Sequence, residues 1–167
     1  MKVLVAHGSQ FGSTAQIAER IAQILRDEGH DPITAPADEA PDPSTFDAAV
    51  IGSAVQGGHY LKGAAAFLDH YRASLSSRPV WLFSSGPVGD RAVAAPQPEP
   101  KEVARVRATI RPRDHRVFAG AFDRATADFN GLGFVSRTIV PRFLPQGDWR
   151  EWDAIESWAR GIARALR

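Results

Sequence analysis

The residues best suited to chemistry form a short, hydroxyl-rich stretch near the start of the chain. The stretch reads Ser9, Gln10, Phe11, Gly12, Ser13 and Thr14. It follows the apolar run 3–6 and precedes an amphipathic run that begins at Ala15, which predicts a strand, a loop and a helix. The first turn of a helix offers unpaired N–H groups and the positive end of a dipole. With its hydroxyls as neutral donors, the loop is a candidate phosphate cradle that needs no Lys or Arg, and Gly12 is expected to let the backbone close around the anion.

Two more loops rich in small and polar residues follow two other apolar runs. The first contains Ser53, Ala54, Val55, Gln56, Gly57, Gly58, His59 and Tyr60. The second contains Ser84, Ser85, Gly86, Pro87, Val88, Gly89 and Asp90. The Gly57-Gly58 pair permits a peptide that reorients at low cost, or else a structural turn that leads into the next helix. The sequence leaves both interpretations of this pair open.

The elements that must position these loops alternate between strand and helix. Apolar runs at 2–7, 48–53, 80–84 and 116–122 predict strands, and 32–35 predicts a weaker one. Helical spacing predicts helices over 13–28, 62–75 and 101–110, with Gly29 as a stop signal. A last helix is predicted from the three- and four-residue spacing of apolar side chains between Trp149 and Leu166. This alternation predicts a parallel sheet covered on both faces.

Composition limits the classes to which the chain can belong. Its 167 residues, 44% of them hydrophobic, predict one domain over 1–167. The absence of Cys excludes disulfides, thiolate nucleophiles and Cys-ligated metals, and the five His show no ligand spacing, so no metal site is expected. No apolar run approaches the ~20 residues of a membrane span, and no secretory signal is recognised, so a cytoplasmic protein is expected.

Charge is distributed unevenly along the chain. Residues 1–100 carry a balance of about −4 and residues 101–167 one of about +5. Much of the excess lies in the run of basic residues 101–116, which is either a patch for an anionic partner or a solvated helix face. Nucleic acid is not expected as a partner, because this run has no interleaved aromatic residues for base stacking.

Several other nucleotide-binding and catalytic classes lack their required residues. The first loop has neither the Gly-Lys of a P-loop nor the G-x-G-x-x-G of a dinucleotide fingerprint. The chain has no G-x-S-x-G elbow for a hydrolase. A receiver domain would need acidic residues at the strand ends where His7-Gly8-Ser9 and Gly52-Ser53 stand.

With a phosphate loop after the first strand and two glycine-containing loops after later strands, the sequence resembles the flavodoxin family. The resemblance implies an α/β fold with a doubly wound, five-stranded parallel sheet of order 2-1-3-4-5 and helices on both faces. It implies FMN as cofactor, with the phosphate at residues 9–14 and the isoalloxazine between the second and third loops. The cofactor-binding residues implied are Ser9, Gln10, Phe11, Gly12, Ser13, Thr14, Ser53, Ala54, Val55, Gln56, Gly57, Gly58, His59, Ser85, Gly86, Pro87, Val88, Gly89 and Asp90.

The carboxyl-terminal part is similar to the menaquinone-dependent protoporphyrinogen dehydrogenase branch of that family. The similar segments are 120–124, 136–144 and 147–152, and residues 124–147 stand where the branch has an insertion before its last helix. This implies an oxidoreductase that passes electrons or hydride between a reduced donor and a small acceptor, with a quinone as one acceptor and porphyrinogen as one substrate. No catalytic side chain is identified.

The apolar segment 129–144 leaves three interpretations open. It covers a flavin face, packs as a helix on the sheet, or contacts the inner face of a membrane as a peripheral anchor. Only His59 and Tyr60 stand where they could stack on the flavin, so one flavin face is expected to be open, which suits an enzyme better than a carrier. A sequence pI near 8.2 also departs from acidic flavodoxin shuttles. The alternatives are a flavodoxin-type electron carrier and a flavin-free module that binds another phosphorylated ligand.

Overall fold

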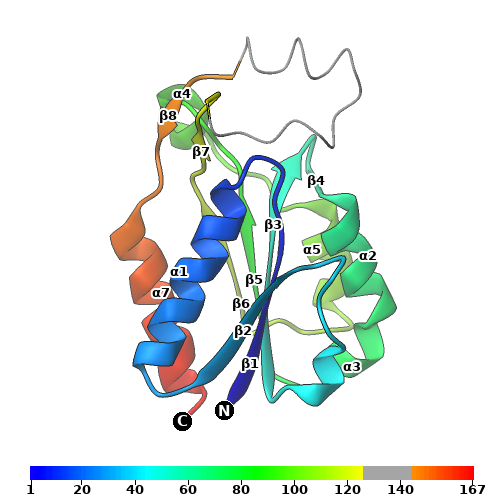
Figure 1. Ribbon diagram of the computed structural model, residues 1–167. Helices are drawn as coiled ribbons and strands as arrows, with labels where there is room; N and C mark the ends of the chain where they lie inside the picture. Colours follow the sequence, from blue (N-terminus) through cyan, green and yellow to red (C-terminus); the bar gives the residue numbers. More distant parts are fainter. Residues whose placement is uncertain (126–143) are drawn as a thin grey trace.

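The computed structural model of the protein describes residues 1–125 and 144–167. Its centre is a parallel sheet of five strands that run side by side in the order β2-β1-β3-β5-β6 (Figure 1). The strands are β1 (Lys2–Gly8), β2 (Asp31–Pro36), β3 (Ala48–Gln56), β5 (Val80–Ser85) and β6 (Asp114–Phe118). This confirms the predicted doubly wound sheet. The strand order is the predicted 2-1-3-4-5 when the short strand β4, which pairs with β3 beside this path, is left out of the count.

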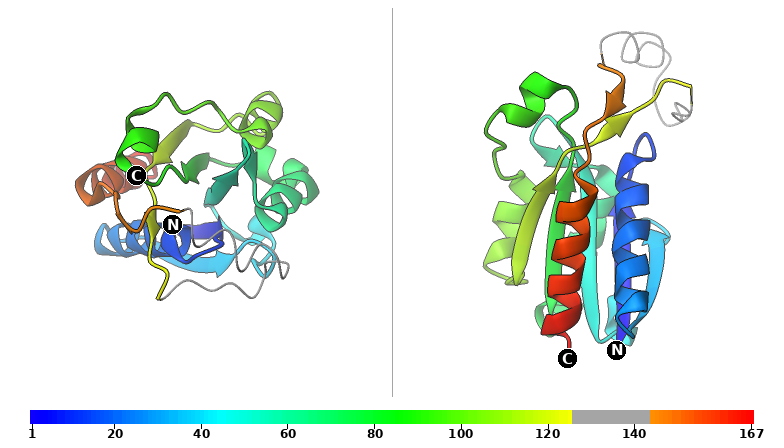
Figure 2. Two further views of the ribbon diagram at one scale, coloured as in Figure 1. Left: turned by 90° about the horizontal axis from the view of Figure 1, so that it is seen from above. Right: turned by 90° about the vertical axis from the view of Figure 1, so that its left-hand side faces the viewer.

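Helices cover both faces of the sheet (Figure 2). On one face lie α1 (Ser13–Asp27) and α7 (Trp152–Ala165), and on the other lie α2 (Lys62–His70), α3 (Arg72–Ser76) and α5 (Lys101–Arg107). Two buried apolar clusters, one on each face, fill the space between sheet and helices. The apolar stripes that predicted α1 and α7 are the sides that these helices bury.

Short elements extend the carboxyl edge of the sheet, where the three predicted loops lie. The two-residue strand β4 (His59–Tyr60) pairs antiparallel with the end of β3, and β7 (Ala121–Phe122) pairs antiparallel with β8 (Gly147–Asp148). The remaining short elements are the 3-10 helix η1 (Pro43–Thr45) and the helix α4 (Asp90–Ala94). Among the described helices, none is long and apolar enough to cross a membrane.

Four predicted boundaries were wrong. The helix expected over 62–75 is divided at Tyr71, whose φ of −98° and ψ of 19° leave helical geometry. The helix expected over 101–110 ends at Arg107, and the last helix begins at Trp152, not Trp149. The strand expected over 116–122 is two strands, because β6 starts at Asp114 and ends at Phe118 before the chain turns into β7. Apolar runs do not mark the breaks at Tyr71, Arg107 and Phe118, because buried residues lie on both sides of each of these three.

Candidate functional site

A cavity of about 470 Å³ opens where the carboxyl ends of β1, β3 and β5 meet. Each of the three predicted loops contributes to its wall. The lining residues are Gln10, Phe11, Ser13 and Thr14 from the first loop; Ala54, Val55, Gln56 and Gly57 from the second; Ser85, Gly86 and Val88 from the third; and Gly120, Ala121, Phe122 and Leu144. Its volume is in the range of small-molecule and cofactor sites. Ligand crevices of doubly wound sheets lie at such strand ends.

Some of the predicted residues lie outside this cavity. Ser9 and Gly12 line a separate cavity of about 370 Å³ that also borders the first loop. Ser53 is buried, where its hydroxyl accepts a hydrogen bond from the Leu61 N–H and donates to Ala54 O. Asp90 accepts a hydrogen bond from Trp149 Nε1 at 2.6 Å. The other predicted residues that do not line the 470 Å³ cavity are Gly58, His59, Pro87 and Gly89.

The first loop enters α1 through a left-handed residue. Gly12 has a φ of 88°, and its carbonyl accepts the first helical hydrogen bond, from the Gln16 N–H. No side chain caps the helix, so the N–H groups of its first turn have no partner within the helix. An added Cβ at Gly12 would meet no protein atom within 4 Å, so within the chain it is the positive φ that requires glycine here.

The Gly57-Gly58 pair is the two-residue turn of the β3–β4 hairpin. Both glycines have positive φ, 57° and 81°, and the flanking residues Gln56 and His59 pair across the hairpin. Two-residue hairpin turns with positive φ at both positions favour glycine. The structural-turn interpretation therefore holds for this pair, and Gly57 also lines the cavity.

The aromatic side chains at the cavity are not those that the sequence indicated. Tyr60 is buried, and its hydroxyl donates to Phe83 O at 3.0 Å, while His59 Nδ1 lies 2.9 Å from Glu102 Oε1. Burial raises the pKa of the Tyr60 phenol. The cavity is instead lined by Phe11 and Phe122, whose rings meet edge to face at a centroid distance of 5.3 Å.

Sequence reasoning missed the fourth wall of the cavity, formed by residues 120–122. The Ala121 N–H donates to Ser13 Oγ at 2.9 Å and so holds this segment against the start of α1. A Cβ added at Gly120 would lie 3.2 Å from Val88 Cγ1, so glycine keeps this wall open. The sequence did contain a signal for this wall, because residues 120–124 resemble the dehydrogenase branch. That resemblance was not used to assign these residues to the cofactor site.

The cavity wall carries no ionisable side chain among the described residues. The nearest titratable group on β1 is His7, which is 8% exposed and lines the 370 Å³ cavity. Burial lowers the pKa of this imidazole, although Glu19 and Asp38 act in the opposite direction. Within 1–125 and 144–167, no group of three or more His, Cys, Asp or Glu residues is placed to hold a metal ion.

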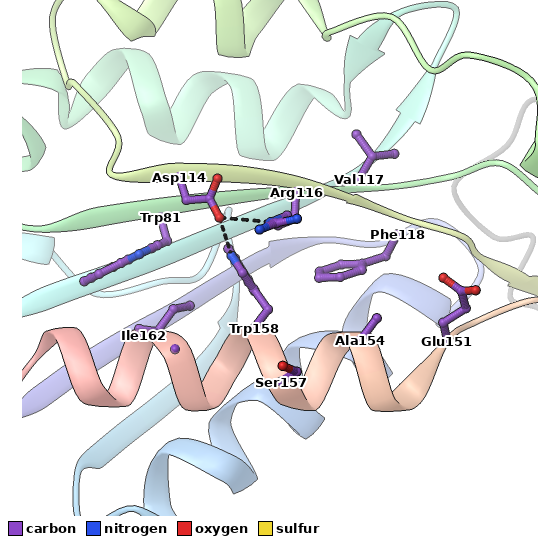
Figure 3. Close-up of a pocket in the computed structure, with 11 residues that line it drawn as sticks. Trp81, Asp114, Arg116, Val117, Phe118, Glu151, Ala154, Ser157, Trp158 and Ile162 are labelled. Carbon is purple, nitrogen blue, oxygen red and sulfur yellow. Dashed lines mark hydrogen bonds and ion pairs between the residues drawn. The ribbon is translucent and has the colours of Figure 1, made fainter.

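A larger groove, of about 610 Å³, lies between β6 and α7 (Figure 3). Within it, the Asp114 carboxylate accepts hydrogen bonds from Trp158 Nε1 at 2.9 Å and Arg116 Nε at 3.0 Å. None of the predicted site residues lines this groove. We therefore place the candidate site in the smaller cavity, where the loops converge.

Three of the six basic side chains in the predicted basic run pair with acidic neighbours. Arg105 pairs with Asp69, Arg107 with Glu99, and Arg116 with Asp114. This favours the solvated helix face over an anion-binding patch.

Comparison with known proteins agrees with this architecture. Residues 4–143 match the family model described as a flavodoxin domain. No curated protein sequence matches the chain. Similar solved structures include an archaeal flavodoxin, with 14% identity, 99% coverage of both chains and a TM-score of 0.66, and a variant of flavodoxin from Pseudomonas aeruginosa, with 16% identity, 99% coverage of both chains and a TM-score of 0.64.

A longer protein also contains a similar unit. Rubredoxin oxygen:oxidoreductase from Desulfovibrio gigas aligns with a TM-score of 0.61 and 17% identity over 99% of this chain, which spans only 36% of that protein. At these identities the structural neighbours show the fold alone, whereas the family model covers most of the sequence. The chain therefore belongs to the flavodoxin domain family, whose members bind FMN.

Proposed function

We propose that the 470 Å³ cavity holds FMN and that the protein passes electrons or hydride between a reduced donor and a small acceptor. The observation that carries this proposal is the convergence of three loops at one cavity beside the uncapped start of α1. The first-turn N–H groups and the hydroxyls of Ser9, Ser13 and Thr14 would hold the phosphate. The second and third loops would flank the isoalloxazine.

The donors and walls of the cavity fit this cofactor. A phosphate monoester carries roughly −1.5 to −2 charges at neutral pH, and helix N-termini stabilise such anions. The rest of the wall is mostly apolar or formed by small residues, which suits a flat aromatic ring system. When bound, FMN supplies one-electron and hydride transfer chemistry. The residues of this chain bind and orient it, and Phe11 and Phe122 limit access of water from the side of β7.

Substitution of the two loop hydroxyls tests the phosphate assignment. Thr14→Val combined with Ser9→Ala should weaken FMN binding by at least about tenfold, because each hydrogen bond to a charged group contributes about 1.5–3 kcal/mol. Flavin fluorescence quenching measures the affinity. Thr109→Val with Ser76→Ala is the matched control, since both hydroxyls donate to carbonyls within their own turns, away from the cavity.

Because Ser9 Oγ also accepts the Gly12 N–H at 3.1 Å, riboflavin binding is measured in parallel. Riboflavin affinity should be nearly unchanged if the loop keeps its shape. Unchanged FMN affinity in the double variant would place the phosphate elsewhere.

Thermal stabilisation by different ligands separates a flavin site from a general phosphate module. A ligand that binds only the folded chain raises its melting temperature according to its concentration relative to Kd. FMN should stabilise the protein much more than riboflavin or inorganic phosphate at equal concentration. Equal stabilisation by FMN and phosphate would instead favour the flavin-free alternative.

We further propose that the acceptor is a quinone and that a porphyrinogen is a substrate. The support is the resemblance of residues 120–124 and 147–152 to the dehydrogenase branch, together with the place of residues 120–122 in the cavity wall. The segment 129–143, for which membrane contact or a flavin cover was expected, lies outside the described residues, and Leu144 lines the cavity. Protein loaded with FMN and reduced without oxygen should be reoxidised rapidly by a menaquinone analogue. Reoxidation no faster than that of free reduced FMN would overturn this acceptor.

A further inference from the structure

One wall of the cavity is attached to a helix that does not itself line the cavity. The hairpin of β3 and β4 presents Gln56 and Gly57 to the cavity, while its outer side contacts the first turn of α5. The Lys101 N–H, at the start of α5, donates to Gly58 O at 3.1 Å. The carbonyl of Gly58 is therefore held toward α5.

The next residue of α5, Glu102, makes two more hydrogen bonds with the hairpin. Its Oε2 accepts the Tyr60 N–H at 2.8 Å, and its Oε1 lies 2.9 Å from His59 Nδ1. Glu102 is only 8% exposed, so this carboxylate is committed to the hairpin rather than to solvent. Burial alone would raise the pKa of Glu102, but the hydrogen bonds from His59 and the Tyr60 N–H lower it, which keeps the carboxylate charged at neutral pH.

The opposite end of the hairpin reaches the phosphate loop. Gln56 Nε2 donates to Gln10 Oε1 at 3.3 Å, and both side chains line the cavity. The turn between these attachments consists of Gly57 and Gly58, two residues with the least backbone resistance to rearrangement. The attachment to α5 therefore adds to the strand pairing of Gln56 with His59 in restricting the conformations of this turn.

We propose that Glu102 is a positioning residue for the cofactor cavity, which acts through the Gly57-Gly58 hairpin to set the wall beside the isoalloxazine. This inference rests on the proposed FMN function. Glu102 does not touch the cavity, so its effect is on the shape of the wall and not on contact with the ligand. With the Gly58 carbonyl held by α5, the Gly57-Gly58 peptide is the part of the turn still free to adjust to the ring.

Flavin binding by Glu102 variants tests the proposal. Glu102→Ala removes both acceptor oxygens. It should weaken the binding of FMN and of riboflavin by the same factor, at least about fivefold, because the hairpin wall faces the ring and not the phosphate. Glu102→Gln keeps one acceptor oxygen and should lie between Glu102→Ala and the unaltered protein. Glu99→Gln is the matched control, because Glu99 pairs with Arg107 and lies near His115, and its charge acts on Tyr60 of the hairpin only through space, without a hydrogen bond to the hairpin among the described residues.

A second measurement separates positioning from stability. The midpoint potential of bound flavin and the shape of its visible spectrum should change in Glu102→Ala and remain unchanged in Glu99→Gln. A purely structural loss would instead lower the melting temperature without altering the environment of the ring. If the unaltered protein binds no FMN, the proposed function fails. If it binds FMN, and Glu102→Ala leaves affinity, potential and spectrum unchanged, the positioning role alone is overturned.

Discussion

At the scale of single residues, Asp114 links the edge strand β6 to the helix α7. Its Oδ1 accepts the N–H of His115, and its Oδ2 accepts Trp158 Nε1 and Arg116 Nε. β6 has a sheet neighbour on one side only among the described strands, and unpaired edge N–H groups promote pairing with other chains. Asp114 therefore satisfies one N–H group of this edge strand and fixes α7 to it.

The charge of Asp114 should be visible in stability. Burial raises the pKa of its carboxyl, but the hydrogen bonds from Trp158 and Arg116 outweigh burial and lower it. A lowered folded-state pKa contributes stability that is present above the ordinary value of 3.8 and is lost as the pH falls below it. Asp114→Asn should therefore lower the free energy of unfolding by about 1 kcal/mol at pH 7 and by less at pH 3. The value at pH 7 is kept small because the side chain is 40% exposed and solvent weakens its interactions.

Urea unfolding at the two pH values measures this difference. Asp69→Asn is the control, because that carboxylate is similarly exposed and pairs with Arg72 and Arg105 but receives no indole or backbone donor. An Asp114→Asn cost that is the same at both pH values would contradict the role of charge.

At the scale of elements, the β3–β4 turn and helix α2 give opposite expectations for the same substitution. Gly57 and Gly58 have positive φ and open space around them, so Gly→Ala there carries a backbone cost of about 1–2 kcal/mol without any clash. Gly63 lies within α2, and an added Cβ would be 3.5 Å from Asp38 Cβ, an ordinary contact. Gly63→Ala should raise stability by about 0.5–1 kcal/mol.

Chemical denaturation of the three single variants tests this pair of expectations. Gly57→Asn is a useful fourth variant, because Asn tolerates positive φ better than Ala does, so this variant should lose less stability than Gly57→Ala. Destabilisation by Gly63→Ala, or none by Gly57→Ala, would contradict the backbone argument.

The sequence indicated those elements whose signal is local. Apolar runs predicted β1, β3 and β5 because these strands are buried on both faces, and helical spacing predicted α1 and α7 because each buries one stripe. β6 was misplaced because it is an edge strand with polar residues at its start, so its apolar run does not mark its boundary. The Gly57-Gly58 turn was recognised. The hydrogen bonds from β4 to Glu102 were not, because Glu102 is more than forty positions away in sequence.

At the scale of the whole molecule, the same distinction applies to the site. Three loops could be assigned to the carboxyl edge because parallel strands place their ends together. The wall at 120–122 could not, because the chain returns to the cavity after β6 and is held there by long-range hydrogen bonds, among them the one from Ala121 to Ser13. The stacking assignment of His59 and Tyr60 depended on position in a loop, and their partners Glu102 and Phe83 turn both side chains away from the cavity.

Acid stability should depend on two histidines, one on β1 and one on β6. His7 on β1 is buried, and the side chain of His115 on β6 is only 8% exposed. Desolvation lowers the pKa of each imidazole from 6.5, and nearby carboxylates, Glu99 at His115 and Glu19 and Asp38 at His7, oppose the shift. The unfolded chain therefore binds protons at these two sites more readily than the folded chain. The stability linked to them is complete above pH 6.5 and falls as the pH drops below that value.

Melting temperatures between pH 8 and pH 5 should therefore decrease more steeply in the unaltered protein than in a His7→Asn, His115→Asn double variant. The double variant should be less stable at pH 8, because the contact of His115 Nε2 with Ser84 Oγ at 2.7 Å is lost. The carboxylates of Glu102 and Asp114 titrate at lower pH, since their pKa values are shifted down, so they do not account for a change in this window. Equal slopes in the two proteins would show that acid sensitivity arises elsewhere, whereas a flatter slope in the variant would assign it to the two buried imidazoles.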